Sequence, residues 1–92
     1  MILAHKPHTV GDRRRYIVDY SQWLSEGSTI SAAAASTTSL TASVDGVTHD
    51  TTTITFFVNG GELNGVFVVN LQMTDSLGEI KLDTIEYFCV AP

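Results

Sequence analysis

Apolar and polar residues alternate along most of the chain from residue 16 onward, with the two-residue period of a β-strand. The clearest case is the segment 66–74, in which Phe67, Val69, Leu71 and Met73 are apolar while most even-numbered positions between them are polar. Successive side chains of a strand point to opposite faces of a sheet. The segment therefore predicts a strand with one buried face and one face toward water.

Five further stretches predict strands, at residues 15–21, 29–35, 40–44, 51–58 and 79–90. The alanine tract 32–35 is interpreted as strand because a short helix without charged pairs is marginal in water. In this strand Ile30, Ala32 and Ala34 would share the apolar face. In the last stretch the apolar positions change phase near Asp83, which predicts a β-bulge or a change of partner strand.

Turn-forming residues separate these stretches. Residues 21–27 fit one helical turn ended by glycine, Asp45-Gly46 predicts a hairpin, and residues 59–61 and 75–78 predict a stop and a tight turn. Short strands with regular turn signals are typical of a β-sandwich. We predict an all-β fold, an Ig-like antiparallel β-sandwich of six to seven short strands over residues 13–92, preceded by an extended N-terminal arm over residues 1–12.

The apolar faces and the single tryptophan supply the expected core, with Trp23 as its large residue beneath the first turn. The expected core residues are Tyr16, Val18, Tyr20, Trp23, Leu24, Ile54, Phe56, Phe67, Val69, Leu71 and Met73. Phe57 has the opposite phase to its neighbours and is therefore expected to be exposed, where it could anchor a protein contact. Alternatively, Ile2 and Leu3 of the arm cover it.

Charge is distributed unevenly. Residues 1–15 carry Lys6 and three arginines against Asp12, whereas residues 16–92 carry Lys81 against nine carboxylates, and the net charge is −5. The acidic body argues against nucleic acid, because binding phosphates requires many cations. The arm has no alternation, so we expect it to be disordered in a free monomer and to become ordered against a neighbouring protein. The contact candidates are Ile2, Leu3, Lys6, Arg13, Arg14, Arg15 and Phe57. A merely solvated entry to the first strand is the simpler alternative.

Catalysis and metal binding find little support in the sequence. The three histidines are His5 and His8 in the arm and His49 in the body, whereas a stable metal site needs three or four convergent ligands. The single Cys89 excludes an internal disulfide and is expected to be an inert core thiol. No apolar run approaches the ~20 residues of a membrane span. We predict no enzymatic activity, no cofactor and no membrane partner.

One motif resembles a known family. Residues 16–24 read YIVDYSQWL and are followed by Gly27 and Thr29-Ile30. They are similar to the opening strand, Trp-Leu turn and second strand of small tailed-bacteriophage virion proteins of the fibre/tail adaptor type. The segment 66–90 resembles the later part of these proteins, whereas the alanine tract and the C-terminal end depart from their pattern. The resemblance implies an Ig-like fold and a structural role in the virion.

We therefore predict a non-enzymatic virion protein that joins head–tail or tail-fibre components by protein–protein contacts. The expected partners are other virion proteins, such as portal, tail, fibre or capsid subunits, in a multi-copy assembly. Two alternatives remain open at this point: a capsid decoration protein, and a carbohydrate-binding or adhesion module. The latter would require clustered exposed aromatic residues, and only Phe57 clearly qualifies.

Overall fold

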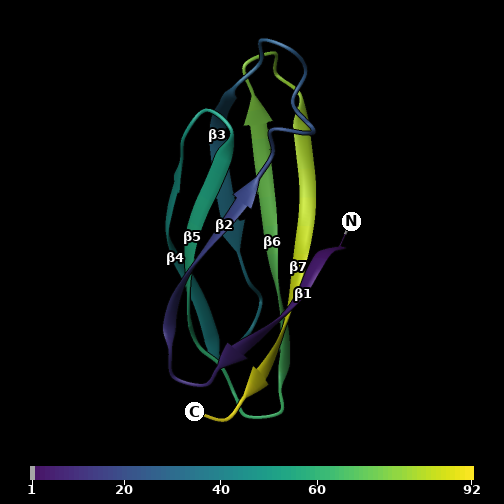
Figure 1. Ribbon diagram of the computed structural model, residues 1–92. Helices are drawn as coiled ribbons and strands as arrows, with labels where there is room; N and C mark the ends of the chain where they lie inside the picture. The colour runs from purple at the N-terminus through teal and green to yellow at the C-terminus, as the bar shows by residue number, and fades with distance from the viewer. Residues whose placement is uncertain (1) are drawn as a thin grey trace.

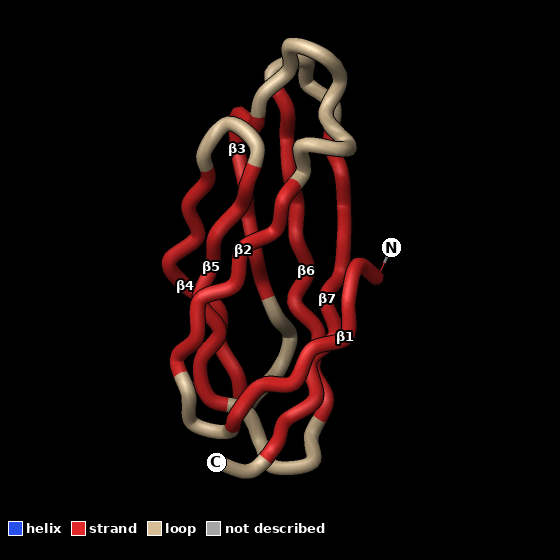
Figure 2. The backbone as a smooth tube through the Cα atoms, in the orientation of Figure 1, coloured by secondary structure: helices blue, strands red, loops and turns tan. Residues whose placement is uncertain are grey.

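The computed structural model describes the backbone of residues 2–92 and the side chains from residue 4 onward. The chain forms seven strands in two sheets, joined by turns and loops (Figures 1 and 2). The strands are β1 (Ile2–Thr9), β2 (Arg13–Asp19), β3 (Ile30–Ser36), β4 (Ala42–His49), β5 (Thr53–Gly60), β6 (Val66–Asp75) and β7 (Ile80–Val90). No helix occurs within the described residues that is long and apolar enough to cross a membrane.

The two sheets pack face to face. One has the strand order β1-β7-β6-β3 and the other has the order β2-β5-β4. All neighbouring strands are antiparallel except β1, which pairs parallel to β7. The all-β sandwich predicted from the alternation is thereby confirmed, whereas its Ig-like character stays a prediction.

The core lies between the sheets and comes mainly from alternate positions of β5, β6 and β7. The buried apolar side chains are Tyr20, Ile30, Ala42, Ile54, Phe56, Val58, Phe67, Val69, Leu71, Met73, Ile85, Tyr87 and Cys89. Tyr16, Val18 and Leu24 are partly buried and pack against this cluster. Buried aromatic rings meet at one place, where Phe67 stacks on Tyr87 with ring centroids 5.2 Å apart.

Trp23 is not the core residue that the sequence predicts. Its exposed fraction is 37%, whereas that of Tyr20 is 3%. The main-chain turn closed by the Leu24 N–H donating to the Tyr20 carbonyl at 3.0 Å puts Tyr20 beneath the turn. Trp23 instead faces the Lys81 ammonium, which lies 5.8 Å from the ring centroid. Side chains of a strand alternate regularly between the two faces, whereas those of a turn have no such fixed direction. The apolar character of Trp23 therefore does not determine that it points into the core.

The bulge predicted in the last strand is absent from its pairing with β6, and the predicted alternative, a change of partners near Asp83, corresponds to β1 joining β7 from Thr84 onward. β6 and β7 pair without a register shift from Val66↔Phe88 to Thr74↔Ile80. The odd positions of β7 therefore face inward throughout, and Asp83 is buried, with 2% of its surface exposed. Its carboxylate accepts hydrogen bonds from the Tyr20 hydroxyl at 3.1 Å and the Lys81 ammonium at 3.0 Å. These partners allow a charged residue to occupy a core position, which the apolar pattern cannot indicate.

Three register shifts lie elsewhere within the described residues, and besides the one in β1 between Ile2 and Ala4, two affect predicted features. A register shift between Ile30 and Ala32 turns Ala33 and Ala35, rather than Ala32 and Ala34, toward the core. A second shift, in β4 between Asp45 and Thr48, replaces the predicted hairpin. Gly46 has φ +60° there, a conformation that glycine adopts without strain, so the strand continues through the site.

The N-terminal segment differs most from the expectation. Residues 2–9 form β1, which pairs with β7 of the same chain from Ile2↔Thr84 to Thr9↔Val90. The expected disordered arm, with a boundary at residue 12, is instead an edge strand of the sandwich. The physical reason is that β7 offers a free edge and that the core accepts the His8 ring, which is 1% exposed.

Candidate protein-binding groove

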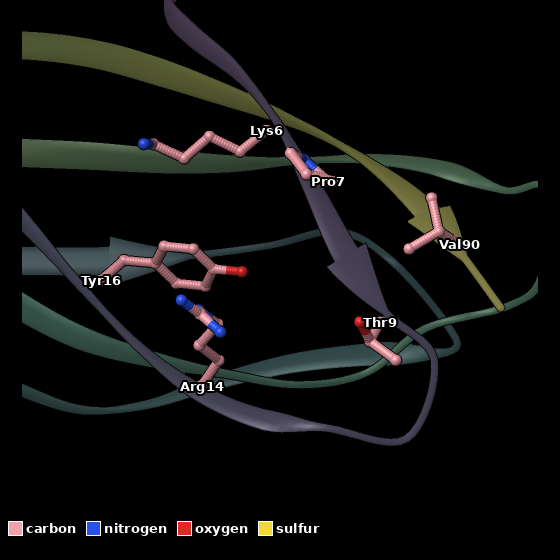
Figure 3. Close-up of a pocket in the computed structure, with 6 residues that line it drawn as sticks. All are labelled: Lys6, Pro7, Thr9, Arg14, Tyr16 and Val90. Carbon is pink, nitrogen blue, oxygen red and sulfur yellow. The ribbon is translucent and has the colours of Figure 1, made fainter. Parts of the chain in front are cut away.

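A groove opens between β1 and β2, which are edge strands of different sheets. Its volume is about 360 Å³, and it is lined by Lys6, Pro7, Thr9, Arg14, Tyr16 and Val90. The two strands are joined by a short turn, in which the Asp12 N–H donates to the Thr9 carbonyl at 3.0 Å. In the view of Figure 3 the ring of Tyr16 lies between the side chains of Lys6 and Arg14. The structure thus brings together two of the predicted contact residues, Lys6 and Arg14.

The groove is cationic. Among the described residues the ion pairs are His5–Glu86, Arg13–Asp45 and Lys81–Asp83, and none of them involves Lys6 or Arg14. No carboxylate lines the groove either. Two of the five lysine and arginine side chains of an acidic protein therefore share one concave surface without an ion-pair partner among the described residues, although the Asp12 carboxylate of the adjoining turn acts on Tyr16. Such a surface favours a negatively charged ligand.

The Tyr16 hydroxyl is a hydrogen-bonding group of the same groove, and the buried side chain of His8 positions it. It lies 3.1 Å from Nδ1 of His8. Burial raises the pKa of Tyr16, although the Arg14 guanidinium acts in the opposite direction. Because the phenol stays protonated at neutral pH, its hydroxyl can donate a hydrogen bond to a ligand in the His8 tautomer that carries its proton on Nδ1, since Nδ1 then donates to the hydroxyl.

The other predicted contact residues lie elsewhere. Arg13 contacts Asp45 at 2.8 Å, and its guanidinium carbon lies 3.9 Å from the centre of the Phe57 ring. Phe57 is consequently half-buried under Arg13 rather than free. Arg15 is exposed on the outer side of β2, and the side chains of Ile2 and Leu3 lie outside the described residues. The alternation of β2 therefore divides the three arginines between two faces of the strand.

Sequence reasoning missed an apolar outer face on the four-stranded sheet. Its members are Val66, Ile80, Leu82 and Phe88, of which Leu82 is 64% exposed and Ile80 58% exposed. Val66 and Phe88 are directly paired across β6 and β7. Ile80 and Leu82 share the phase of Phe88 and are out of phase with the buried Ile85 and Tyr87, which was the available signal. Polar residues, among them the paired Asn70 and Thr84, separate Val66 and Phe88 from Ile80 and Leu82, so the face carries two small apolar groups that are candidates for protein contacts.

The sandwich fold, the cationic groove and the exposed apolar residues describe a small all-β protein whose candidate sites lie on its surface. Within the described residues, no three histidine, cysteine or carboxylate side chains are grouped to hold a metal ion. Residues 8–86 match the model of the family described as podophage GP4 fiber-tail adaptor protein gp77, and the chain belongs to this family. The resemblance noted in residues 16–24 is thereby confirmed. The protein is a structural protein of the phage tail adaptor type and a component of the virion.

A solved structure supports the fold alone. It is the 2,6-sialyltransferase of Vibrionaceae Photobacterium sp. JT-ISH-224, in a ternary complex with CMP and lactose. The similarity has a TM-score of 0.52 at 10% sequence identity, and it covers 99% of this chain but 18% of the sialyltransferase chain. None of the curated proteins matches the chain significantly.

Proposed function

We propose that this protein joins a fibre to the phage tail by protein–protein contacts, with no enzymatic step of its own. The observation that carries the proposal is the match of residues 8–86 to a family of fibre–tail adaptors. The two exposed surfaces support it, because an adaptor needs separate contacts for two partners. The groove lies between the edge strands β1 and β2, while the apolar residues lie on the outer face of β6 and β7.

The size of the chain favours function within an assembly. A domain of 92 residues buries only about 60–65% of its unfolded surface, so its stability alone is modest. Binding to partner proteins adds stability by mass action. We therefore include multi-copy incorporation at the junction of tail and fibre in the proposal, and we regard tail and fibre subunits, rather than portal or capsid subunits, as the partners.

Deleting the gene from the phage tests this function. We expect particles with complete heads and tails that lack fibres in electron micrographs, and we expect recombinant protein added in trans to restore the fibres. Antibody labelling should place the restored protein where tail and fibre meet. Normal fibre attachment without the protein would contradict the proposal, and labelling spread over the head would favour capsid decoration instead.

A single substitution tests the apolar face. We expect Leu82→Glu to lower incorporation into particles at least about tenfold, because a charge replaces an apolar contact residue in a desolvated interface. The side chain is mostly exposed, so the thermal midpoint of the free protein should hardly change. Gln72→Glu is the matched control, since Gln72 is the cross-strand partner of Leu82 and is exposed beside it. Equal loss in both variants would show that any negative charge on this sheet is harmful and would refute a specific role for Leu82.

A further inference from the structure

The cationic groove between β1 and β2 has the parts of a site for a single negatively charged side chain. It holds two cations on opposite strands, Lys6 and Arg14, and the Tyr16 hydroxyl (Figure 3). Its volume of about 360 Å³ is sufficient for a side chain and a short piece of its main chain, but it does not form an extended track. Charged hydrogen bonds from lysine and arginine to a carboxylate are among the strongest in proteins.

Behind the groove, a buried histidine supports the tyrosine. His8 lies with its ring 6.1 Å from Phe67 and 6.3 Å from Tyr87, and its Nδ1 is 3.1 Å from the Tyr16 hydroxyl. Nε2 of His8 is buried and has no hydrogen-bond partner among the described residues. Among the described residues, the ring thus has one polar partner, the hydroxyl of Tyr16, which lines the groove. Buried polar side chains are normally hydrogen-bonded. The hydrogen bond between His8 and the Tyr16 hydroxyl therefore holds the hydroxyl in place beside the groove.

We infer that the groove binds the carboxylate of an aspartate or glutamate in an extended segment of a neighbouring virion protein, through Lys6, Arg14 and the Tyr16 hydroxyl. This inference rests on the proposed adaptor function and names the chemistry of one partner. Lys6 and Arg14 supply the charge, and Tyr16, held by His8, supplies a directed hydrogen bond. Specific recognition then depends on one buried acidic residue of the partner, as is usual for hot spots in protein interfaces.

Nucleic acid fits this groove less well than an acidic protein segment. A phosphate backbone is held by cations spread along an extended path, and each phosphate contacted adds to the binding. Here Lys6 and Arg14 share one groove, Arg15 lies alone on the opposite face of β2, and the whole molecule carries a net charge of −5. Long-range repulsion therefore opposes a polyanion but not a partner with a single protruding carboxylate.

A second copy of this chain is also a poorer occupant. Six of its ten carboxylates are engaged inside the molecule, either in the three ion pairs or as acceptors from turn N–H groups. The remaining four are Asp12, Glu26, Glu62 and Glu79. Asp12 belongs to the β1–β2 turn beside the groove, Glu62 lies in the β5–β6 loop at the same end, and Glu26 and Glu79 lie in loops at the far end of the long axis (Figure 1). A contact between opposite ends would be heterologous, and it generates an open filament unless the rotation between neighbours closes a ring.

Zero-length cross-linking of intact particles tests the inference. A carbodiimide joins a carboxyl group to a lysine amine that it touches, forming an amide with loss of water. We expect mass spectrometry to find Lys6 linked to an aspartate or glutamate of another virion protein. Lys81, whose ammonium contacts Asp83 inside the molecule, is the matched lysine and should give no product with another chain. Lys6→Arg should abolish the cross-link and preserve incorporation, since the charge is retained.

Removal of charge gives a second readout. The double variant Lys6→Gln/Arg14→Gln should fold with an unchanged thermal midpoint, because both side chains are exposed, and should be incorporated at least about tenfold less. Arg15→Gln is the control, because Arg15 lies on the opposite face of β2.

The outcomes separate the two proposals. Particles that contain the protein, with Lys6 uncross-linked and the double variant incorporated normally, would overturn the inference and leave the adaptor function standing. A cross-link from Lys6 to a peptide of this same protein would refute the claim that a different virion protein occupies the groove. Particles that never contain the protein would overturn the proposed function, and the inference with it.

Discussion

Replacing Asp83 with alanine is expected to lower the free energy of unfolding by about 3–5 kcal/mol, the usual cost of breaking a buried ion pair by removing one partner. The Asp83 side chain is fully buried and that of Lys81 is 18% exposed. After the substitution the Lys81 ammonium would have lost its counter-ion, and the Tyr20 hydroxyl would have lost its acceptor. Urea unfolding measures the effect, which corresponds to a midpoint lower by about 1–3 M for a small domain.

The matched control replaces the pair as a whole. Lys81→Met/Asp83→Leu removes both charges while keeping similar volumes, and such replacements are often neutral or stabilising. We expect this double variant to unfold within about 1 kcal/mol of the wild type or above it. An unchanged urea midpoint for Asp83→Ala would show that the contacts of Asp83 with Tyr20 and Lys81 do not stabilise the folded state.

Deleting residues 1–9 is expected to destabilise the sandwich by about 3 kcal/mol or more, lowering the thermal midpoint by at least about 12 °C for a domain of this size. The deletion removes the β1–β7 pairing and the buried His8 side chain, and it exposes one side of the aromatic cluster. The uncovered edge of β7 would also promote aggregation, because its backbone groups lose their partners. Differential scanning calorimetry of both proteins measures the change.

Two measurements keep this prediction open to refutation even if the truncated chain does not fold. In the intact free protein, amide protons of β1 that bond to β7 should exchange with solvent about as slowly as those of β6. His8→Ala, which retains the strand, should lower the thermal midpoint by a smaller amount. Rapid exchange throughout β1, or a truncated protein as stable as the intact one, would contradict this prediction and support a disordered N-terminal arm.

The alternation of apolar and polar residues predicts a strand well when all of its inward positions are apolar. β5 and β6 follow the period-two rule closely, since Ile54, Phe56 and Val58 are all inward while Asn70 and Gln72 of β6 are outward. The interpretation fails where a core position is polar. Asp83 and His8 are buried through hydrogen bonds and aromatic contacts to residues distant in sequence, and these partners leave no local trace.

Similar reasoning explains the partial success at the candidate site. The excess of cations in the first residues was visible, and strand alternation places Arg14 apart from Arg13 and Arg15. That Lys6 faces the same groove could not be foreseen, because it depends on the parallel pairing of β1 with β7. Pro7 and the absence of alternation in residues 1–9 also argued against a strand there, although an edge strand tolerates proline.

The parallel pairing of β1 and β7 has a consequence for synthesis of the protein. Ile2 pairs with Thr84 and Thr9 with Val90, so the first strand to leave the ribosome has its partner in the last. Bringing such distant segments together costs loop-closure entropy and slows folding. A ribosome-bound chain that stops before residue 80 can form β2–β5 pairing but has no place for β1. Completion of the four-stranded sheet thus waits until β7 has been synthesised, and chains that stop before β7 should be recognisable by a protease-sensitive β1 segment.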